Sequence, residues 1–208
     1  MDRSDRAGPA ALGACVLAFC AAMGLSAELN IWIGTGAAAL VSLFVLWVGA
    51  RSSVSFGLRR STVASVAAGT LVGIAMSVAT WCLYPLSITV FPPLQGEVET
   101  LYALLRQPPG PIRAFPLLLL VVLAEELVWR GLAIDLFSKR FGPLRAVLIS
   151  ALLYVLPQVA LGSPLLMIVA LLCGLLWGTL RVRFGCLAAP FIAHLVWDLL
   201  VFVLYPVI

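Results

Sequence analysis

Long runs of apolar residues, separated by short polar segments, dominate this chain. Each run approaches the about 20 residues that a helix needs to cross the hydrocarbon core of a bilayer, and the pattern predicts seven membrane-spanning helices. Their predicted bounds are 9–27, 31–50, 62–86, 114–137, 144–161, 164–181 and 186–205. The sequence therefore predicts an all-α, polytopic membrane protein.

The connector between the third and fourth predicted spans, Ser87–Arg113, is the longest of the loops. Proline pairs at Pro92-Pro93 and Pro108-Pro109 bracket a segment with helical spacing of apolar residues. The apolar positions are Val98, Leu101 and Leu105, and the polar positions on the other face are Glu97, Glu99 and Arg106. This pattern predicts a short helix in the membrane interface, which serves either as a simple connector or as a lid or guide for substrate.

Basic residues in the loops are distributed very unevenly between the two sides of the predicted membrane topology. Ten fall on the side of the N-terminus: Arg3, Arg6, Arg51, Arg59, Arg60, Lys139, Arg140, Arg145, Arg181 and Arg183. The opposite side has only Arg106 and Arg113. Because cytoplasmic loops carry the excess of Lys and Arg, we expect the N-terminus in the cytoplasm and the C-terminus outside. Twelve of the thirteen basic residues are arginine, which is typical of a GC-rich bacterial genome, so we expect a bacterial inner membrane.

The composition excludes a soluble globular protein, because 63% of the residues are hydrophobic and only 11% are charged. We expect a single integral-membrane domain over 1–208, made of N-terminal spans and an outer loop (1–113) and a core (114–205). The net charge of +4 lies in short loops beside the lipid bilayer, so we do not expect nucleic acid as a partner. The five cysteines show no CxxC spacing and are interpreted as small apolar residues of the helix bundle.

Five ionisable side chains lie deep inside the predicted spans, at least seven residues from either end, and carry the candidate chemistry: Glu125, Glu126, Arg130, His194 and Asp198. A charge near the bilayer centre costs roughly 2.5–3.5 kcal/mol on insertion scales, so such groups are usually paired and functional. Their combination of carboxylates, a guanidinium and an imidazole indicates hydrolytic chemistry within the membrane.

Helical spacing divides these residues into two groups. Glu126 and Arg130 are four residues apart and share a face, which predicts a structural ion pair. Glu125 lies about 100° away around the helix and is left to face a cavity as the candidate general base. His194 and Asp198 are also four residues apart, so the carboxylate can fix the tautomer of the imidazole.

These motifs resemble the CPBP family of intramembrane proteases, also called the CAAX-prenyl-protease-like or Abi family. The family carries Glu-Glu-x-x-x-Arg, Phe-x-x-x-His and His-x-x-x-Asn/Asp on separate membrane helices. The first motif matches 125–130 and the third matches 194–198, where a Pro190-Phe191 lead-in precedes His194. Further phrases that look like the family begin at Phe56, Gly142 and Gly174, and the resemblance is specific over about 114–200. It implies an intramembrane endopeptidase whose site lies inside the helix bundle, with 114–205 as the catalytic core.

One motif departs from the family pattern, because Tyr154 and Gln158 stand where the family has phenylalanine and histidine. His194 is the sole histidine, so two histidines of one chain cannot hold a metal. Zinc could still be held by Glu125, His194 and Asp198. In the metal-free alternative, which we favour, Glu125 activates a water and Gln158 donates to the oxyanion.

The resemblance leaves the substrate and the activity itself open. We expect a membrane-anchored protein cleaved near the outer membrane face. A candidate substrate is a C-terminal sorting tail, because some bacterial members of the family, the myxosortases, remove such tails. The alternative is an inactive family member that acts as a membrane scaffold or bacteriocin-immunity factor, which the Gln158 replacement supports. A small proton-relaying transporter is a third hypothesis, weakened by the lack of charge elsewhere in the spans.

Overall fold

The computed structural model describes residues 3–50 and 61–208, and within them it is helical without any strand. The elements are α1 (Arg3–Gly24), α2 (Ile31–Gly49), α3 (Val63–Val90), α4 (Pro93–Leu105), α5 (Phe115–Glu125), η2 (Glu126–Ala133), α6 (Ile134–Phe141), α7 (Pro143–Leu161), α8 (Pro164–Phe184), α9 (Ala188–Asp198) and η3 (Leu199–Leu204). The two η elements are π-helices that continue α5 and α9 without a break. The predicted all-α fold class is confirmed.

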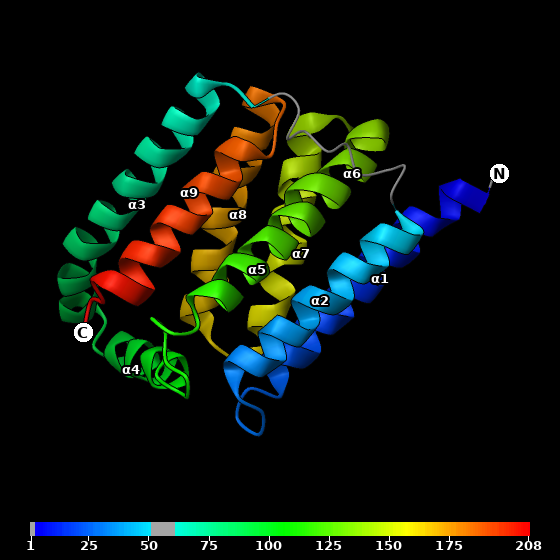
Figure 1. The fold of residues 1–208 in the computed structure, drawn as a ribbon. Helices are drawn as coiled ribbons and strands as arrows, with labels where there is room; N and C mark the ends of the chain where they lie inside the picture. The colour runs from blue at the N-terminus through cyan, green and yellow to red at the C-terminus, as the bar shows by residue number, and fades with distance from the viewer. Residues whose placement is uncertain (1–2, 51–60) are drawn as a thin grey trace.

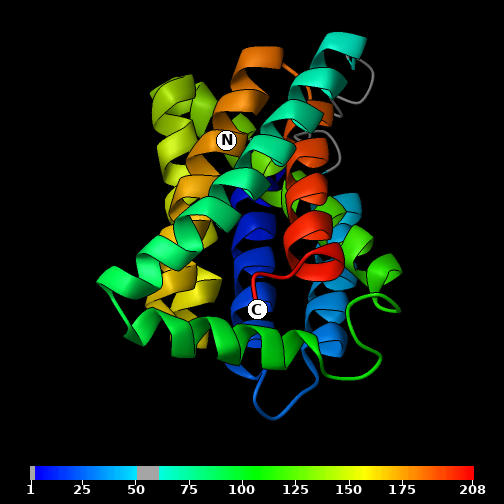
Figure 2. The same cartoon turned by 90° about the vertical axis from the view of Figure 1, so that its left-hand side faces the viewer.

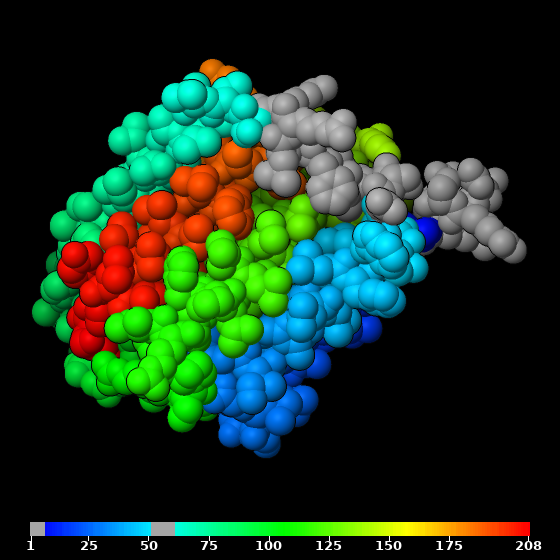
Figure 3. Space-filling view, in the orientation of Figure 1, coloured from blue at the N-terminus to red at the C-terminus, as the bar shows by residue number. Residues whose placement is uncertain are grey.

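The long helices stand side by side in a bundle, and α4 lies across one end of it (Figure 1; Figure 2). The loops after α1, α3, α4 and α7 gather at the end with α4, whereas the N-terminus and the turns after α6 and α8 lie at the opposite end (Figure 1). On the face shown in Figure 3, α3, α9, α5 and α2 form a continuous surface that covers the interior. This alternation of loop ends is the arrangement that the predicted spans require.

Within the described residues, five helical segments are long and apolar enough to cross a membrane: Ala7–Gly24, α2, α3, α7 and α8. The other two predicted spans correspond to helical runs that π-helices divide, α5–η2–α6 and α9–η3. The protein is thus a multi-pass membrane protein, and the count of seven spans stays a prediction. The predicted loop from Arg51, including Arg59 and Arg60, lies outside the described residues.

Helices approach each other closely at two pairs of glycines that are four residues apart, Gly69 with Gly73 and Gly174 with Gly178. A Cβ on Gly174 would lie 2.9 Å from the Cα of Ala151, so α8 can approach α7 only with glycine at this position. A Cβ on Gly73 would likewise lie 2.8 Å from the carbonyl oxygen of Ala193 on α9. Small residues let membrane helices pack at short distance, and here they bring α8 against α7 and α3 against α9.

The predicted short helix after the third span is present as α4, but one of its acidic residues has a different environment from the predicted one. Instead of lying on a purely polar face, Glu97 accepts hydrogen bonds from the Ser163 hydroxyl (2.8 Å) and the Leu165 amide (2.9 Å). Both groups belong to the start of α8, where unsatisfied backbone N–H groups favour a carboxylate. This contact fixes α4 to the end of the bundle.

The other end of α4 and its middle are also tied to the bundle. The Gln107 side chain accepts from the Ile31 amide (2.8 Å), and the Trp32 indole donates to the Leu105 carbonyl (3.1 Å), both at the start of α2. In the middle of α4, the Tyr102 hydroxyl donates to the Val201 carbonyl of η3 at 2.7 Å. Three separate helices are thereby connected through one short helix.

Candidate active site

A cavity of about 160 Å³ lies inside the bundle beneath α4. Residues of α5, α7, α8 and α9 surround it, and Leu101, Leu104 and Leu105 of α4 close one end. Four of the predicted site residues line it: Glu125, Gln158, His194 and Asp198. The fourth, fifth and seventh predicted spans thus contribute residues to one cavity, and α8 contributes to it as well.

The predicted ion pair is present and is almost completely buried. Arg130 Nη1 lies 3.2 Å from Glu126 Oε1, and each side chain is 1% exposed. The guanidinium also lies over two aromatic rings, 4.6 Å from the Tyr154 centroid and 5.0 Å from the Trp177 centroid. These contacts compensate for the burial of the charge in an apolar interior.

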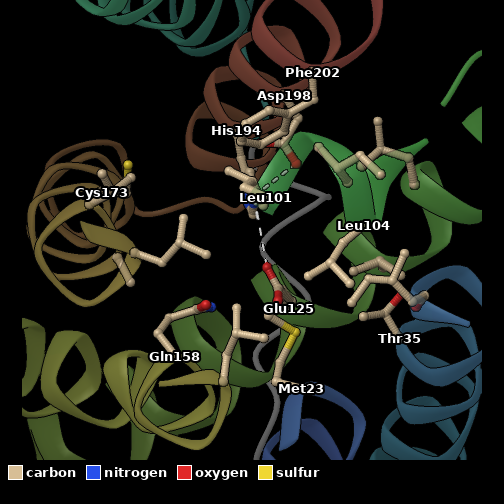
Figure 4. A pocket seen from close by; sticks show the side chains of 18 of the residues that line it. Met23, Thr35, Leu101, Leu104, Glu125, Gln158, Cys173, His194, Asp198 and Phe202 are labelled. Atoms are coloured by element: carbon tan, nitrogen blue, oxygen red, sulfur yellow. Dashed lines mark hydrogen bonds and ion pairs between the residues drawn. The ribbon is translucent and has the colours of Figure 1, made fainter. Parts of the chain in front are cut away.

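The imidazole of His194 lies among three carboxylates. Its Nδ1 is 2.9 Å from Glu126 Oε1. On the other side of the ring, its Nε2 is 3.4 Å from Asp198 Oδ2 and 3.8 Å from Glu125 Oε2 (Figure 4). The short contact therefore fixes Nδ1 as the donor to Glu126, and Nε2 faces the cavity. From the sequence, we expected Asp198 to orient the imidazole of His194. In the structure Glu126 also contacts this imidazole and links it to the ion pair with Arg130.

Glu125 has a different environment from Glu126, as the helical spacing predicted. Its side chain is 15% exposed and its carboxylate points into the cavity (Figure 4). The Tyr154 hydroxyl donates to Glu125 Oε2 at 3.1 Å. The two adjacent glutamates are thus separated into one that is neutralised by arginine and one that faces open space.

A π-helix begins directly after Glu125, which the apolar pattern did not predict. In η2 the wider turns change which carbonyls are bonded within the helix. Two of these carbonyls receive side-chain donors from neighbouring helices: Ser150 Oγ donates to Trp129 O at 2.7 Å, and Arg181 Nε donates to Arg130 O at 3.2 Å. The helix segment that carries the ion pair is therefore fixed from α7 and from α8.

Gln158 reaches the cavity from α7, and its amide points into the same space as the Glu125 carboxylate (Figure 4). Its Oε1 is buried and has no hydrogen-bond partner among the described residues. A buried amide oxygen without a partner is unusual and is available to a donor of a bound molecule. The position that departs from the family pattern therefore still faces the candidate site.

Two aromatic residues of the site were missed as site residues. Tyr154 bonds Glu125, and Trp177 stacks on the His194 ring with centroids 3.8 Å apart and an interplanar angle of 19°. For Tyr154 the signal was its place four residues before Gln158, because this spacing puts both side chains on one face of a helix. For Trp177 the pattern of the sequence held no such signal, since an aromatic residue in an apolar run is indistinguishable from ordinary packing.

The residues were also tested for a metal site. Although Glu125 and Asp198 approach His194 Nε2, residues 3–50 and 61–208 contain no group of three His, Cys, Asp or Glu side chains arranged to hold a metal ion. The ligand set considered from the sequence does not fit a zinc site in this geometry, and we derive no step through a metal.

Comparison with known proteins finds one similar protein family. Residues 107–200 match the family model described as type II CAAX prenyl endopeptidase Rce1-like. Over these residues, slightly less than half of the chain, the protein is similar to that family. The match covers α5 to α9 with η2 and therefore every residue around the cavity that carries a charge. No curated protein and no solved structure matches the chain.

The family model describes endopeptidases, so the resemblance inferred from the motifs is confirmed over residues 107–200, and the match supports a membrane peptidase. The first half of the chain, including α1 to α4, lies outside the matched region. Those helices nevertheless complete the cavity, because Met23, Trp32 and Leu101 are among its lining residues.

Proposed function

We propose that this protein is an intramembrane endopeptidase in which Glu125 activates a water molecule against a peptide bond of a membrane-anchored protein. The observation that carries the proposal is the difference between the two adjacent glutamates. Glu126 is neutralised by Arg130 and His194, whereas Glu125 faces the cavity with only a neutral hydroxyl as its hydrogen-bond donor. A carboxylate in this position is suited to accept a proton from water.

The cavity residues can divide the chemistry of peptide-bond hydrolysis among them. Glu125 takes a proton from water while the water oxygen bonds to the scissile carbonyl carbon. Gln158 Nε2–H donates to the oxyanion that develops, and His194 Nε2 can donate as well when the ring carries both protons. The C–N bond then breaks, and the leaving amine takes the proton that Glu125 holds. The products are a carboxylic acid and an amine, which exchange a proton to become a carboxylate and an ammonium group, and Glu125 returns to its starting form.

An apolar groove next to the cavity supports a membrane-anchored substrate. A second cavity of about 350 Å³ lies between α3 and α8 and is bounded by α4 and η3. It shares Leu101, Val169 and Phe202 with the 160 Å³ cavity that holds Glu125, which we call the catalytic cavity. Leu83 and Leu172 on its walls are 56% and 61% exposed and would face lipid. A hydrophobic segment in this groove would lie directly beside Glu125.

We further propose that cleavage occurs near the outer face of a bacterial inner membrane. The basic side chains of Lys139, Arg140 and Arg183 are at the end of the bundle opposite to α4, which supports a cytoplasmic location of that end. The catalytic cavity extends towards the α4 end. A C-terminal sorting tail has the matching layout, because its short motif precedes a hydrophobic helix and a cytoplasmic basic cluster.

The decisive experiment replaces Glu125 with Gln, which removes the base and retains the shape. Membrane proteomes of native cells that carry the wild-type or the Glu125→Gln protein are compared for precursors that accumulate. Glu99→Gln is the matched control, because Glu99 is an exposed residue of α4 whose carboxylate accepts a hydrogen bond from the neighbouring Gln95 amide. We expect a precursor with Glu125→Gln alone; normal processing with this variant at wild-type protein level contradicts the proposal and supports a scaffold function.

A further inference from the structure

We infer that Tyr154 is a positioning residue for the Glu125 carboxylate and takes part in setting the rate of the reaction. The inference rests on the proposed function of Glu125 as general base. The Tyr154 hydroxyl lies 3.1 Å from Glu125 Oε2, the same oxygen that lies 3.8 Å from His194 Nε2. Both contacts use Oε2, so they turn Oε1 towards the remaining space of the cavity, where water can approach.

The ring of Tyr154 is held on several sides, so the direction of its hydroxyl is fixed. The Arg130 guanidinium lies 4.6 Å from the ring centroid, and the Trp129 and Trp177 rings lie 5.7 and 6.3 Å away. The backbone of Gly174 also approaches the ring, because a Cβ there would be 3.6 Å from Tyr154 Cδ1. A side chain packed in this way loses little freedom when its hydroxyl orients a carboxylate, which is the advantage of a preorganised site.

The same helix face supplies the amide that faces the reacting group. Tyr154 and Gln158 are four residues apart on α7, and both line the catalytic cavity. One turn of α7 thus presents a hydroxyl to the base and an amide to the space beside it. We infer that the two residues work as a unit in this chain: Tyr154 fixes the base and Gln158 contacts the substrate carbonyl.

Tyr154→Phe tests the inference, because it removes the hydroxyl and keeps the ring packing. The probe is an epitope-tagged copy of the precursor that accumulates with Glu125→Gln, added to purified full-length protein. Loss of a hydrogen bond to a charged group should lower kcat about 10- to 100-fold, with KM and the thermal midpoint unchanged. Tyr205→Phe is the control, because Tyr205 is 61% exposed and distant from the cavity lining.

Replacement of Tyr154 by 3-fluorotyrosine separates a positioning function from a packing function. Fluorine makes the phenol a stronger donor with little change in volume, so kcat should change only if the hydroxyl acts on Glu125. In the absence of substrate, the infrared bands that differ between wild type and Glu125→Gln report this carboxyl, and Tyr154→Phe should shift them.

The outcomes are distinguishable. If Glu125→Gln is inactive but Tyr154→Phe and the fluorinated protein cleave at the wild-type rate, the inference on Tyr154 is wrong and the proposed function stands. If Glu125→Gln cleaves like the wild type, the proposed function itself fails. If Tyr154→Phe lowers the thermal midpoint together with kcat, the fluorinated protein decides: an altered rate supports positioning, and an unaltered rate overturns it.

Discussion

The buried pair of Glu126 and Arg130 allows a quantitative test of how the site is held together. Replacement of Glu126 by Gln leaves the Arg130 guanidinium charged and 1% exposed, without its carboxylate. It also removes the charge that His194 Nδ1 contacts at 2.9 Å. The variant therefore leaves a buried cation uncompensated and weakens the orientation of the imidazole at the same time.

The expected magnitude follows from the burial. Breaking a buried ion pair by removing one partner costs about 3–5 kcal/mol of folding free energy, which corresponds to a fall of roughly 6–20 °C in the thermal midpoint for a chain of this size. Removing both charges with Glu126→Gln and Arg130→Met should cost less than the sum of the single changes, since neither charge is then left unpaired. Glu125→Gln should change the midpoint little, because Glu125 has no arginine partner in the structure.

Intrinsic tryptophan fluorescence during thermal unfolding in detergent is a suitable assay. Trp129 and Trp177 are fully buried beside the pair, so they report on this part of the bundle. Protein abundance in the membrane provides a second measurement. A midpoint for Glu126→Gln within 1–2 °C of the wild type, or strictly additive single and double variants, would refute the structural role of the pair.

Two further predictions concern the mechanism and the orientation. Activity should survive stringent treatment with EDTA or phenanthroline, because the described side chains form no three-residue metal group; loss of activity that zinc restores would reverse this expectation. A Gln158→Cys variant with the native cysteines removed should react with an impermeant thiol reagent added outside intact spheroplasts, because Gln158 is three residues from the α4-side end of α7, about 5 Å along the helix axis. Reaction only after the cytoplasmic face is exposed would contradict cleavage at the outer face.

Much of the fold and part of the site could be predicted from the sequence, because helical periodicity has a direct geometric meaning. The spacing of four residues placed Glu126 with Arg130 and His194 with Asp198, and the one-residue offset placed Glu125 on another face. The helix bounds differ from the apolar runs by a few residues, since loops near the interface extend as helix in α3 and α8. Local rules therefore suffice where the contact lies within one helix.

Contacts between helices could not be predicted in this way. The bond of Glu126 to His194 joins residues 68 positions apart, and the bond of Tyr154 to Glu125 joins residues 29 positions apart. The π-helices after Glu125 and Asp198 depend on donors from other helices, as the Ser150 and Tyr102 hydroxyls show. Glu97 was likewise assigned to a polar face because its partners at the start of α8 lie more than 60 positions away.

The way α4 is tied to the bundle has a consequence for biogenesis. Its partners at Ser163 and Val201 are synthesised after α4 itself, and His194 and Asp198 belong to the last helical run. A nascent chain that has inserted its first helices therefore has neither a closed cavity nor a complete site. The ribosome must deliver the last helix before α4 can dock against η3. The order of translation thus keeps the emerging site incomplete until α9 and η3 have been synthesised.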